Sequence, residues 1–536
     1  MAKQILYGQD AREAIRRGVS QVARAGRTTL GPRGRHVIVQ QSDGSMLVTK
    51  DGVTVVQQIE LEDPFENLGA RLIRQTADVT SRRAGDGTTT ATLLAESIFI
   101  EGLKAVAAGI NPIGLKQGIE LAVRDVVRKV QDFAVPVTDV ARLRQVATVA
   151  SNGDTEIGQL LADVLSAAGE DMVTIEDGRG AATEVEWVDG LKFGRGFLSP
   201  YFVTHPETGQ VVLENPRILA TDGSLASIQP LIPLLEAAAN SDRPLLIIAR
   251  DVQGEALAGL VLNATQKTVS CCAVKAPEFG DRARDFLDDL AVFTGGQTVS
   301  AEAGQDLKDV QLENLGMAKR VVVTRDDTLI VGGAGRGKLV ETRLQYLRTI
   351  RCSAEAADAE WVDRRIAQLG GRVAKILVGA RTESELLEKK ARLDDALHAA
   401  QAAREEGIVP GGGVALLRAA QSLENSGVDG ELKIGYQAVL KACRTPLTAI
   451  ADNAGRSGTA VCEHVAEHST GYGYDASLDV FQDLMEAGIV DASKVVTQAL
   501  ENAGSLSATL LTSDAVIAES VDGAGIAKRE QSAFRW

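Results

Sequence analysis

Apolar residues recur every three or four positions in two parts of the chain, a spacing typical of amphipathic helices. The clearest run follows Asn111-Pro112, a helix-start signal. Its apolar members are Leu115, Ile119, Val123, Val127 and Val130. Similar periodicity returns after about residue 380. We therefore predict long helices near both ends of the chain.

The middle of the chain has a different pattern. Short β-rich runs at 244–249 (PLLIIA) and 320–324 (RVVVT) alternate with helical stretches such as 254–267. Pro136, Gly190 and Gly370-Gly371 interrupt regular structure and mark plausible boundaries of this region. The pattern predicts an α/β domain inserted between helical segments, and a length of 536 residues fits three or four domains.

The amino-acid composition argues against several classes of protein and partner. The 45% hydrophobic and 24% charged residues exclude a disordered chain, and no uncharged apolar run is long enough to predict a membrane-spanning helix. The formal charge of −15 and 4% aromatic content disfavour nucleic acid as a partner. Five scattered cysteines without CxxC spacing indicate a reducing compartment. With no export signal in MAKQILYGQD, we expect a cytoplasmic protein.

Three motifs suggest sites but favour structural interpretations. Residues 332–338 (GGAGRGK) resemble a P-loop, but Leu339 stands where Ser or Thr should hold Mg²⁺, so a flexible glycine turn is favoured. His464 and His468 bracket Glu467 as HxxEH without a clear third zinc ligand, which favours a solvated helix face. Cys443 and Cys462 have no adjacent histidine in a catalytic signature, so we predict that they are buried structural thiols.

The segment Gly85-Asp86-Gly87-Thr88-Thr89-Thr90, before a helix-forming run, is the most informative motif. Glycines let a backbone approach a phosphate, hydroxyls and helix N-terminal amides can bind its oxygens, and Asp86 can hold Mg²⁺. The same residue types also suit a simple helix cap, and the motif alone leaves both interpretations open. Further glycine-rich or acidic turns occur at 29–34, 50–52 and 411–413.

The order of these motifs resembles the group I chaperonins of GroEL type. The segments that carry the resemblance are TLGPRGR at 29–35, TKDGVTV at 49–55, ELEDPFENLGA at 60–70, GDGTTTATLLAE at 85–96, EGLKAVAAGINP at 101–112, GRGFLSPYF at 194–202, LDDALHAA at 393–400 and VPGGGVALL at 409–417. The resemblance runs from about residue 2 to about residue 520.

The resemblance implies a chaperonin fold of three domains. These are a mainly helical equatorial ATP-binding domain (1–134 and 405–520), an intermediate hinge domain (135–189 and 373–404), and an α/β apical domain (190–372), followed by a tail (521–536) that we expect to be disordered. It also implies homo-oligomeric heptameric rings that use ATP to enclose unfolded polypeptide clients under a ten-kilodalton co-chaperonin lid.

The resemblance also implies an ATP site. Its nucleotide-binding residues would be Thr29, Leu30, Gly31, Pro32, Lys50, Asp86, Gly87, Thr88, Thr89, Thr90, Gly412, Asp475, Ala476 and Asp491. Asp86 would hold Mg²⁺, with K⁺ as a further candidate cation. Asp395 would orient the attacking water, with Asp51 assisting. Because Asp86 and Asp395 lie more than 300 residues apart, we expect the site to close only when domains rotate.

An apolar client-binding surface is a third implication. Its residues would be Phe197, Tyr201, Phe202, Ile232, Leu235, Leu257, Val261 and Leu262. Helical spacing alone would instead assign Leu257 with Val261, and Ile232 with Leu235, to a core stripe. The resemblance favours an exposed patch able to capture unfolded chains without reading their sequence.

Some segments depart from the family pattern. The Gly-Gly-Met tail is replaced by VDGAGIAKREQSAFRW, Arg372 replaces a hinge glycine, and Thr448 and Ser457 replace a pair that joins one ring to another. A single ring is therefore an open alternative to a double ring. These departures also motivate an alternative function, a chaperonin-like scaffold or holding protein with little refolding activity.

Overall fold

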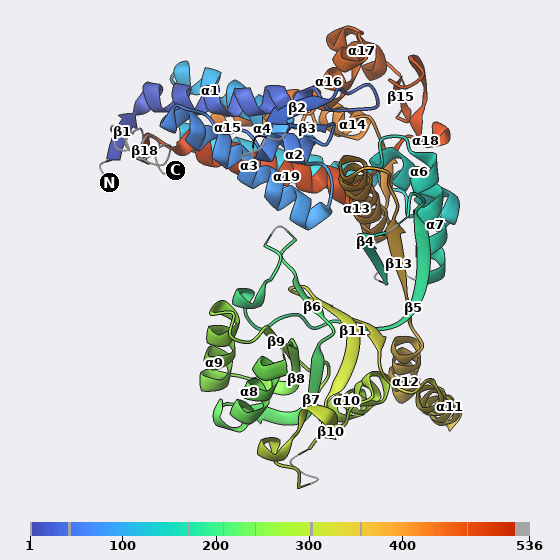
Figure 1. Cartoon of the computed structure of the whole chain (residues 1–536). Coiled ribbons are helices and arrows are strands. Elements are labelled where there is room, and N and C mark those ends of the chain that lie inside the picture. The colour runs from blue at the N-terminus through green and yellow to red at the C-terminus, as the bar shows by residue number, and fades with distance from the viewer. Residues whose placement is uncertain are drawn as a thin grey trace. The chain divides into compact units, whose positions relative to one another are not determined.

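The computed structural model describes residues 3–40, 44, 46–168, 172–178, 180–206, 208–241, 243–300, 304–353, 356–468 and 470–519 (Figure 1). The chain forms two compact units. The first combines Met1–Asp163 with Ala380–Trp536, and the second is Val164–Gly379. The expected division into three domains stays a prediction. The predicted tail at 521–536 lies outside the described residues.

The first unit is mainly helical, as the periodicity predicts. Its long helices pack against one another and are α1 (Gly8–Arg27), α3 (Pro64–Ala84), α4 (Thr88–Ala107), α5 (Pro112–Phe133), α15 (Gly430–Ala442) and α19 (Ser493–Thr512). Figure 1 shows α1, α3, α4, α15 and α19 side by side. The predicted helix start is confirmed, because Asn111 Oδ1 accepts a bond from the Ile113 amide at 2.9 Å and α5 begins at Pro112. Leu115 and Ile119 are fully buried.

Further helices complete this unit. They are α2 (Gly52–Gln57), α6 (Val140–Ala150), α7 (Thr155–Ala168), α13 (Glu383–Glu406), α14 (Val414–Ser422), α16 (Thr445–Asn453), α17 (Gly458–Ala466) and α18 (Leu484–Ala487). The last residues of α7 belong to the second unit, because the division falls after Asp163.

Small antiparallel strand pairs also belong to the first unit. They are β1 (Lys3–Tyr7) with β18 (Ala515–Glu519), β2 (Val37–Gln40) with β3 (Met46–Thr49), β14 (Ile408–Pro410) with β17 (Val490–Ala492), and β15 (Tyr472–Asp475) with β16 (Val480–Asp483). Ile5 pairs with Ile517 across β1 and β18. This pairing joins segments from the two ends of the described chain.

The second unit is built on one mixed sheet of order β4-β13-β5-β12-β11-β7-β8-β9, with β6 beside β11 and β10 beside β7. Its strands are β4 (Val173–Asp177), β5 (Glu184–Phe193), β6 (Val211–Glu214), β7 (Arg217–Leu225), β8 (Leu245–Val252), β9 (Cys271–Lys275), β10 (Thr298–Val299), β11 (Gly316–Val323), β12 (Thr328–Gly333) and β13 (Arg372–Val378). The parallel strands β7, β8 and β9 include fully buried Leu245 and Ile247, which explains the apolar run at 244–249.

Helices flank this sheet (Figure 1). They are α8 (Ile232–Ser241), α9 (Gly254–Thr265), α10 (Asp281–Thr294), α11 (Gly337–Ser353) and α12 (Ala356–Leu369). The glycine segment 332–338 connects β12 to α11. A Cβ atom at Gly335 would lie 2.1 Å from the Val292 carbonyl oxygen, so this glycine permits close packing against α10. That contact supports the structural interpretation of the P-loop-like segment.

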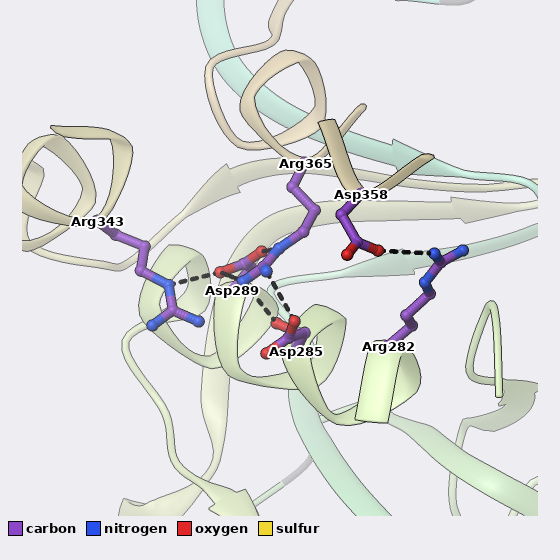
Figure 2. Close-up of polar contacts among 6 residues, drawn as sticks. All are labelled: Arg282, Asp285, Asp289, Arg343, Asp358 and Arg365. Atoms are coloured by element: carbon purple, nitrogen blue, oxygen red, sulfur yellow. Dashed lines mark hydrogen bonds and ion pairs between the residues drawn. The ribbon is translucent and has the colours of Figure 1, made fainter. Parts of the chain in front are cut away.

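A network of ion pairs connects α10, α11 and α12 (Figure 2). Asp289 of α10 is buried and accepts from Arg343 Nε and Arg365 Nε, both at 2.6 Å. Arg365 also pairs with Asp285 at 2.8 Å. Because both Asp289 and Arg365 are withdrawn from water, removing either charge would leave the other without full compensation. The network therefore fixes three helices to one another.

Candidate functional site

A cavity of about 740 Å³ lies within the first unit. Every residue predicted to bind nucleotide lines it, as do the predicted catalytic residues Asp51 and Asp395. The lining includes the loop after α1, the starts of α2, α4, α14 and α19, the helices α6, α13 and α16, the strand β17 and the β15–β16 hairpin. The structure thus brings together segments that are hundreds of residues apart in the chain.

The turn between α3 and α4 has the geometry of an anion site. Gly85 and Gly87 both adopt positive φ, at +72° and +82°, which lets the chain reverse before α4 begins at Thr88. Among the residues that the structure describes, no side chain caps the first amides of this 20-residue helix, and Asp86 Oδ1 accepts from the Gly87 amide at 2.5 Å. The α4 amides are therefore available to phosphate oxygens, which favours the phosphate interpretation over a simple helix cap.

Two neighbouring loops are held in place by their own hydrogen bonds. Asp51 caps α2, accepting from the Thr54 amide at 2.8 Å and the Thr54 hydroxyl at 2.6 Å. Lys50 Nζ donates to the Pro32 carbonyl at 3.1 Å. Asn453 Nδ2 donates to the Leu30 carbonyl at 2.9 Å. These bonds preorganise the loops at 29–32 and 50–52 around the cavity.

Asp51, Asp86 and Asp395 concentrate negative charge in the cavity. Burial raises the pKa of Asp395 well above its ordinary value, and the carboxylates of Asp86 and Asp51 raise it further. Burial likewise raises the pKa of Asp86, with Asp51 contributing. Carboxylates that repel one another favour the protonated form unless a cation binds among them. The cavity therefore suits a bound cation.

The donor set suits magnesium held together with a nucleotide. Among the residues that the structure describes, no three His, Cys, Asp or Glu side chains are arranged to hold a metal by themselves. Mg²⁺ typically uses one or two carboxylates, waters and substrate phosphates, whereas a complete protein cage is unusual for it. Asp86, beside the uncapped α4 amides, fits that partial role.

The rest of the cavity suits a nucleoside. Gly412 has φ +62°, and its backbone lines the wall together with Asp475, Ala476 and Asp491. Burial raises the pKa of Asp491 to about 7, and Asp86 contributes in the same direction. The sequence prediction missed further lining residues, among them Ile450, Tyr474, Gln482 and Ile489. Their spacing resembles ordinary core and hairpin positions, so only tertiary contacts assign them to the cavity.

Asp395 already lines the same cavity as Asp86 within one unit, although domain rotation was expected to be necessary for closure. Its helix α13 packs closely on the α3–α4 turn, since a Cβ atom at Gly85 would lie 1.9 Å from His398 Cβ. Residues three apart lie on one helix face, so Asp395 and His398 approach this turn together.

The predicted client-binding residues of the second unit differ in exposure. Tyr201 and Leu262 are 70% and 56% exposed. Phe197, Ile232, Leu257 and Val261 are half-buried. Phe202 and Leu235 are only 2% and 6% exposed, which corrects the prediction that they belong to an exposed patch. Phe202 ends the short helix Pro200–Phe202, Leu235 lies on the inner face of α8, and both pack in the sheet's core.

The HxxEH and cysteine motifs have structural roles. The rings of His464 and His468 lie 4.6 Å apart and pack against Tyr472 and Phe481 in an aromatic cluster. Burial raises the pKa of the Cys443 thiol to about 12, consistent with an unreactive core residue. No described helix is long and apolar enough to cross a membrane.

Comparisons with known proteins agree with this architecture. The model of the TCP-1/cpn60 chaperonin family matches residues 22–520. Among solved structures, the chaperonin gp146 from the bacteriophage EL 2 (Pseudomonas aeruginosa), crystallised in the presence of ATP-BeFx, matches with a TM-score of 0.66 at 22% identity. The match covers 96% of this chain and 99% of that chain, and at this identity it shows a shared fold. The predicted fold class is confirmed.

Proposed function

This chain belongs to the TCP-1/cpn60 chaperonin family, whose members hydrolyse ATP, and on that premise we propose that its cavity binds and hydrolyses Mg-ATP to drive the folding of other proteins. Family membership implies an ATP-dependent protein-folding chaperone. The observation that carries the proposal for this chain is that Asp51, Asp86, Asp395 and the uncapped start of α4 line the same cavity.

In the proposed mechanism, each group has a separate task. The α4 amides and the loop at 29–32 bind phosphate oxygens, and Asp86 holds Mg²⁺, which supplies charge neutralisation when bound. Asp395 orients the attacking water, and Asp51, held by its bonds to Thr54, supports that geometry. Positioning and charge neutralisation are the main contributions a protein makes to phosphoryl transfer.

Replacing Asp395 by alanine tests the assignment of the catalytic group. We expect Asp395→Ala to bind Mg-ADP with unchanged affinity but to lose at least tenfold in steady-state ATP hydrolysis, because only the water-orienting group is removed. Phosphate release and calorimetry measure the two properties. Asp394→Ala is the matched control, since this neighbouring carboxylate does not line the cavity. Unchanged turnover in Asp395→Ala would remove this residue from the mechanism.

We propose that clients are non-native polypeptides captured on the second unit and enclosed under a ten-kilodalton lid, as in the group I chaperonins. Tyr201 and Leu262 expose large apolar side chains, and half-buried Leu257 and Val261 border them on α9. Such a patch binds unfolded chains without sequence selection. The revised patch is smaller than the predicted one, because Phe202 and Leu235 belong to the core.

We further propose that the subunits assemble into heptameric rings. The β2–β3 pair exposes Ile38 at 70% and Met46 at 65%, and the β1–β18 pair exposes Tyr7 at 65% and Ile517 at 54%. Short two-stranded pairs with apolar faces are marginal in isolation. Their coverage by neighbouring copies of this chain would explain why these side chains are apolar.

A further inference from the structure

Gln482 is a polar side chain in the wall of the cavity with no role in the mechanism above. It lies on β16, where it pairs with Gly473 of β15. Asp475 lies two residues beyond Gly473 on β15, so the side chains of Asp475 and Gln482 share one face of the hairpin. Ile450 and Ile489 line the same cavity and add apolar surface to it.

Asp475 fixes the orientation of the Gln482 amide. Asp475 as a whole residue is 4% exposed, and its Oδ1 accepts from the Ser477 amide at 2.8 Å and the Leu478 amide at 3.2 Å. Its Oδ2 accepts from Gln482 Nε2 at 2.9 Å. Because a carboxylate only accepts, the amide nitrogen must face Asp475, and Oε1 must face away. Reversing the amide would place Oε1 against Oδ2.

We propose that Gln482 selects adenine over guanine nucleotides, an inference that rests on the proposed nucleotide-binding function of the cavity. Oε1 accepts from the exocyclic amino group of adenine, and the second N–H of Nε2 donates to a ring nitrogen beside it. Glutamine offers this acceptor–donor pair to adenine in other settings. Gln482 is therefore a specificity-determining residue, and Asp475 is the positioning residue that holds its amide.

Guanine presents the opposite pattern of hydrogen-bond donors and acceptors at the corresponding edge of its base. Its O6 accepts where adenine donates, and its N1–H donates where adenine accepts. Matching guanine would require the amide to reverse, and the bond to Asp475 opposes that reversal. Mismatched polar groups in a buried site lose hydrogen bonds that water would otherwise supply.

The test measures the dissociation constants of Mg-ADP and Mg-GDP by calorimetry, which avoids hydrolysis. We expect the wild-type protein to prefer Mg-ADP and Gln482→Leu to reduce the ADP-over-GDP preference about tenfold. Gln498→Leu is the matched control, because Gln498 is also half-buried and donates to a carboxylate, Glu501, at 2.7 Å but lies outside the cavity. If the role of Gln482 were purely structural, Gln482→Leu would weaken the binding of both nucleotides equally.

An unchanged preference in Gln482→Leu, or equal binding of the two diphosphates by the wild-type protein, would overturn the inference while leaving the proposed function intact. Failure of the wild-type protein to bind either diphosphate would overturn both. If Gln482→Leu fails to fold, the wild-type protein is titrated with the purine riboside diphosphate that lacks the amino group. We expect about tenfold weaker binding than for ADP, and equal affinity would overturn the inference.

Discussion

Burial gives Asp491 an unusual protonation equilibrium. Its pKa is raised to about 7, mainly by burial and further by Asp86, whereas the ordinary value is 3.8. Between about pH 4 and pH 7 the folded chain therefore holds a proton that the unfolded chain has released. The free energy of unfolding contributed by this group falls as pH rises through that interval and is level above it.

Asp491→Asn should remove this contribution. Without nucleotide, we expect the free energy of unfolding of the wild-type protein to fall between pH 4 and pH 7 by roughly 2–4 kcal/mol more than that of Asp491→Asn. Each unit of pKa shift corresponds to about 1.36 kcal/mol. Denaturant titrations at several pH values measure the difference. Parallel curves for the two proteins would show that Asp491 titrates normally in the folded chain.

Motifs whose geometry depends only on neighbouring residues could be predicted from the sequence. The glycines around Asp86 indicate a tight turn before a helix, and the structure places Asp86 at that turn. Gln482 carried no comparable signal, because its assignment depends on a bond to Asp475 seven residues away across a hairpin. Phe202 and Leu235 were mispredicted as surface residues because the family resemblance was given more weight than the helical spacing, which alone assigned Leu235 to a core stripe.

At the scale of elements, the network in Figure 2 links α10 to α11 and α12 through Asp289. We expect Asp289→Ala to lower the free energy of unfolding of the second unit by about 3–5 kcal/mol, because it leaves buried Arg365 without its main partner. Hydrogen exchange across these helices and denaturant titration measure the loss.

A second carboxylate provides the control for this network. Asp358 pairs with Arg282 at 3.2 Å, and both side chains are exposed. Asp358→Ala should cost at most about 1 kcal/mol, as is usual for surface ion pairs. Equal costs for the two variants would mean that burial does not distinguish these ion pairs energetically.

The helix α9 offers a test of client capture. We expect Leu262→Ser combined with Tyr201→Ser to reduce binding of a chemically denatured client at least severalfold while ATP hydrolysis is retained, because only exposed apolar area is lost. Light scattering during client dilution reports capture. Leu339→Ser on α11 is the control, since Leu339 is 55% exposed and Leu262 is 56% exposed. Equal capture by the double variant and the wild-type protein would contradict the assigned surface.

Helices were easier to predict than strand pairings. The apolar period fixed α5 and its start at Asn111-Pro112 from neighbouring residues alone. The pairing of β1 with β18 places Tyr7 opposite Ala515, 508 positions later in the chain, and no local pattern specifies such a partner. Long-range pairing follows from the packing of the whole unit.

For the whole molecule, assembly is the decisive property. Native mass spectrometry should give about 396 kDa for seven subunits of 56.6 kDa, or about 792 kDa for fourteen. The larger mass would show that Thr448 and Ser457 permit ring stacking, and the smaller would indicate one ring. A monomer with and without Mg-ATP would contradict the ring proposal, because no enclosed space for a client would exist.

The first unit is built from two separate segments of the chain, and this has a consequence during translation. The helix α5 ends at Phe133, but its packing partner α19 begins only at Ser493, 360 residues later. At ribosomal elongation rates this interval lasts on the order of tens of seconds. The second unit emerges within that interval and has a sheet and core of its own. A newly made subunit therefore carries an unfinished apolar helix face while it grows, and is itself a candidate client of subunits already assembled.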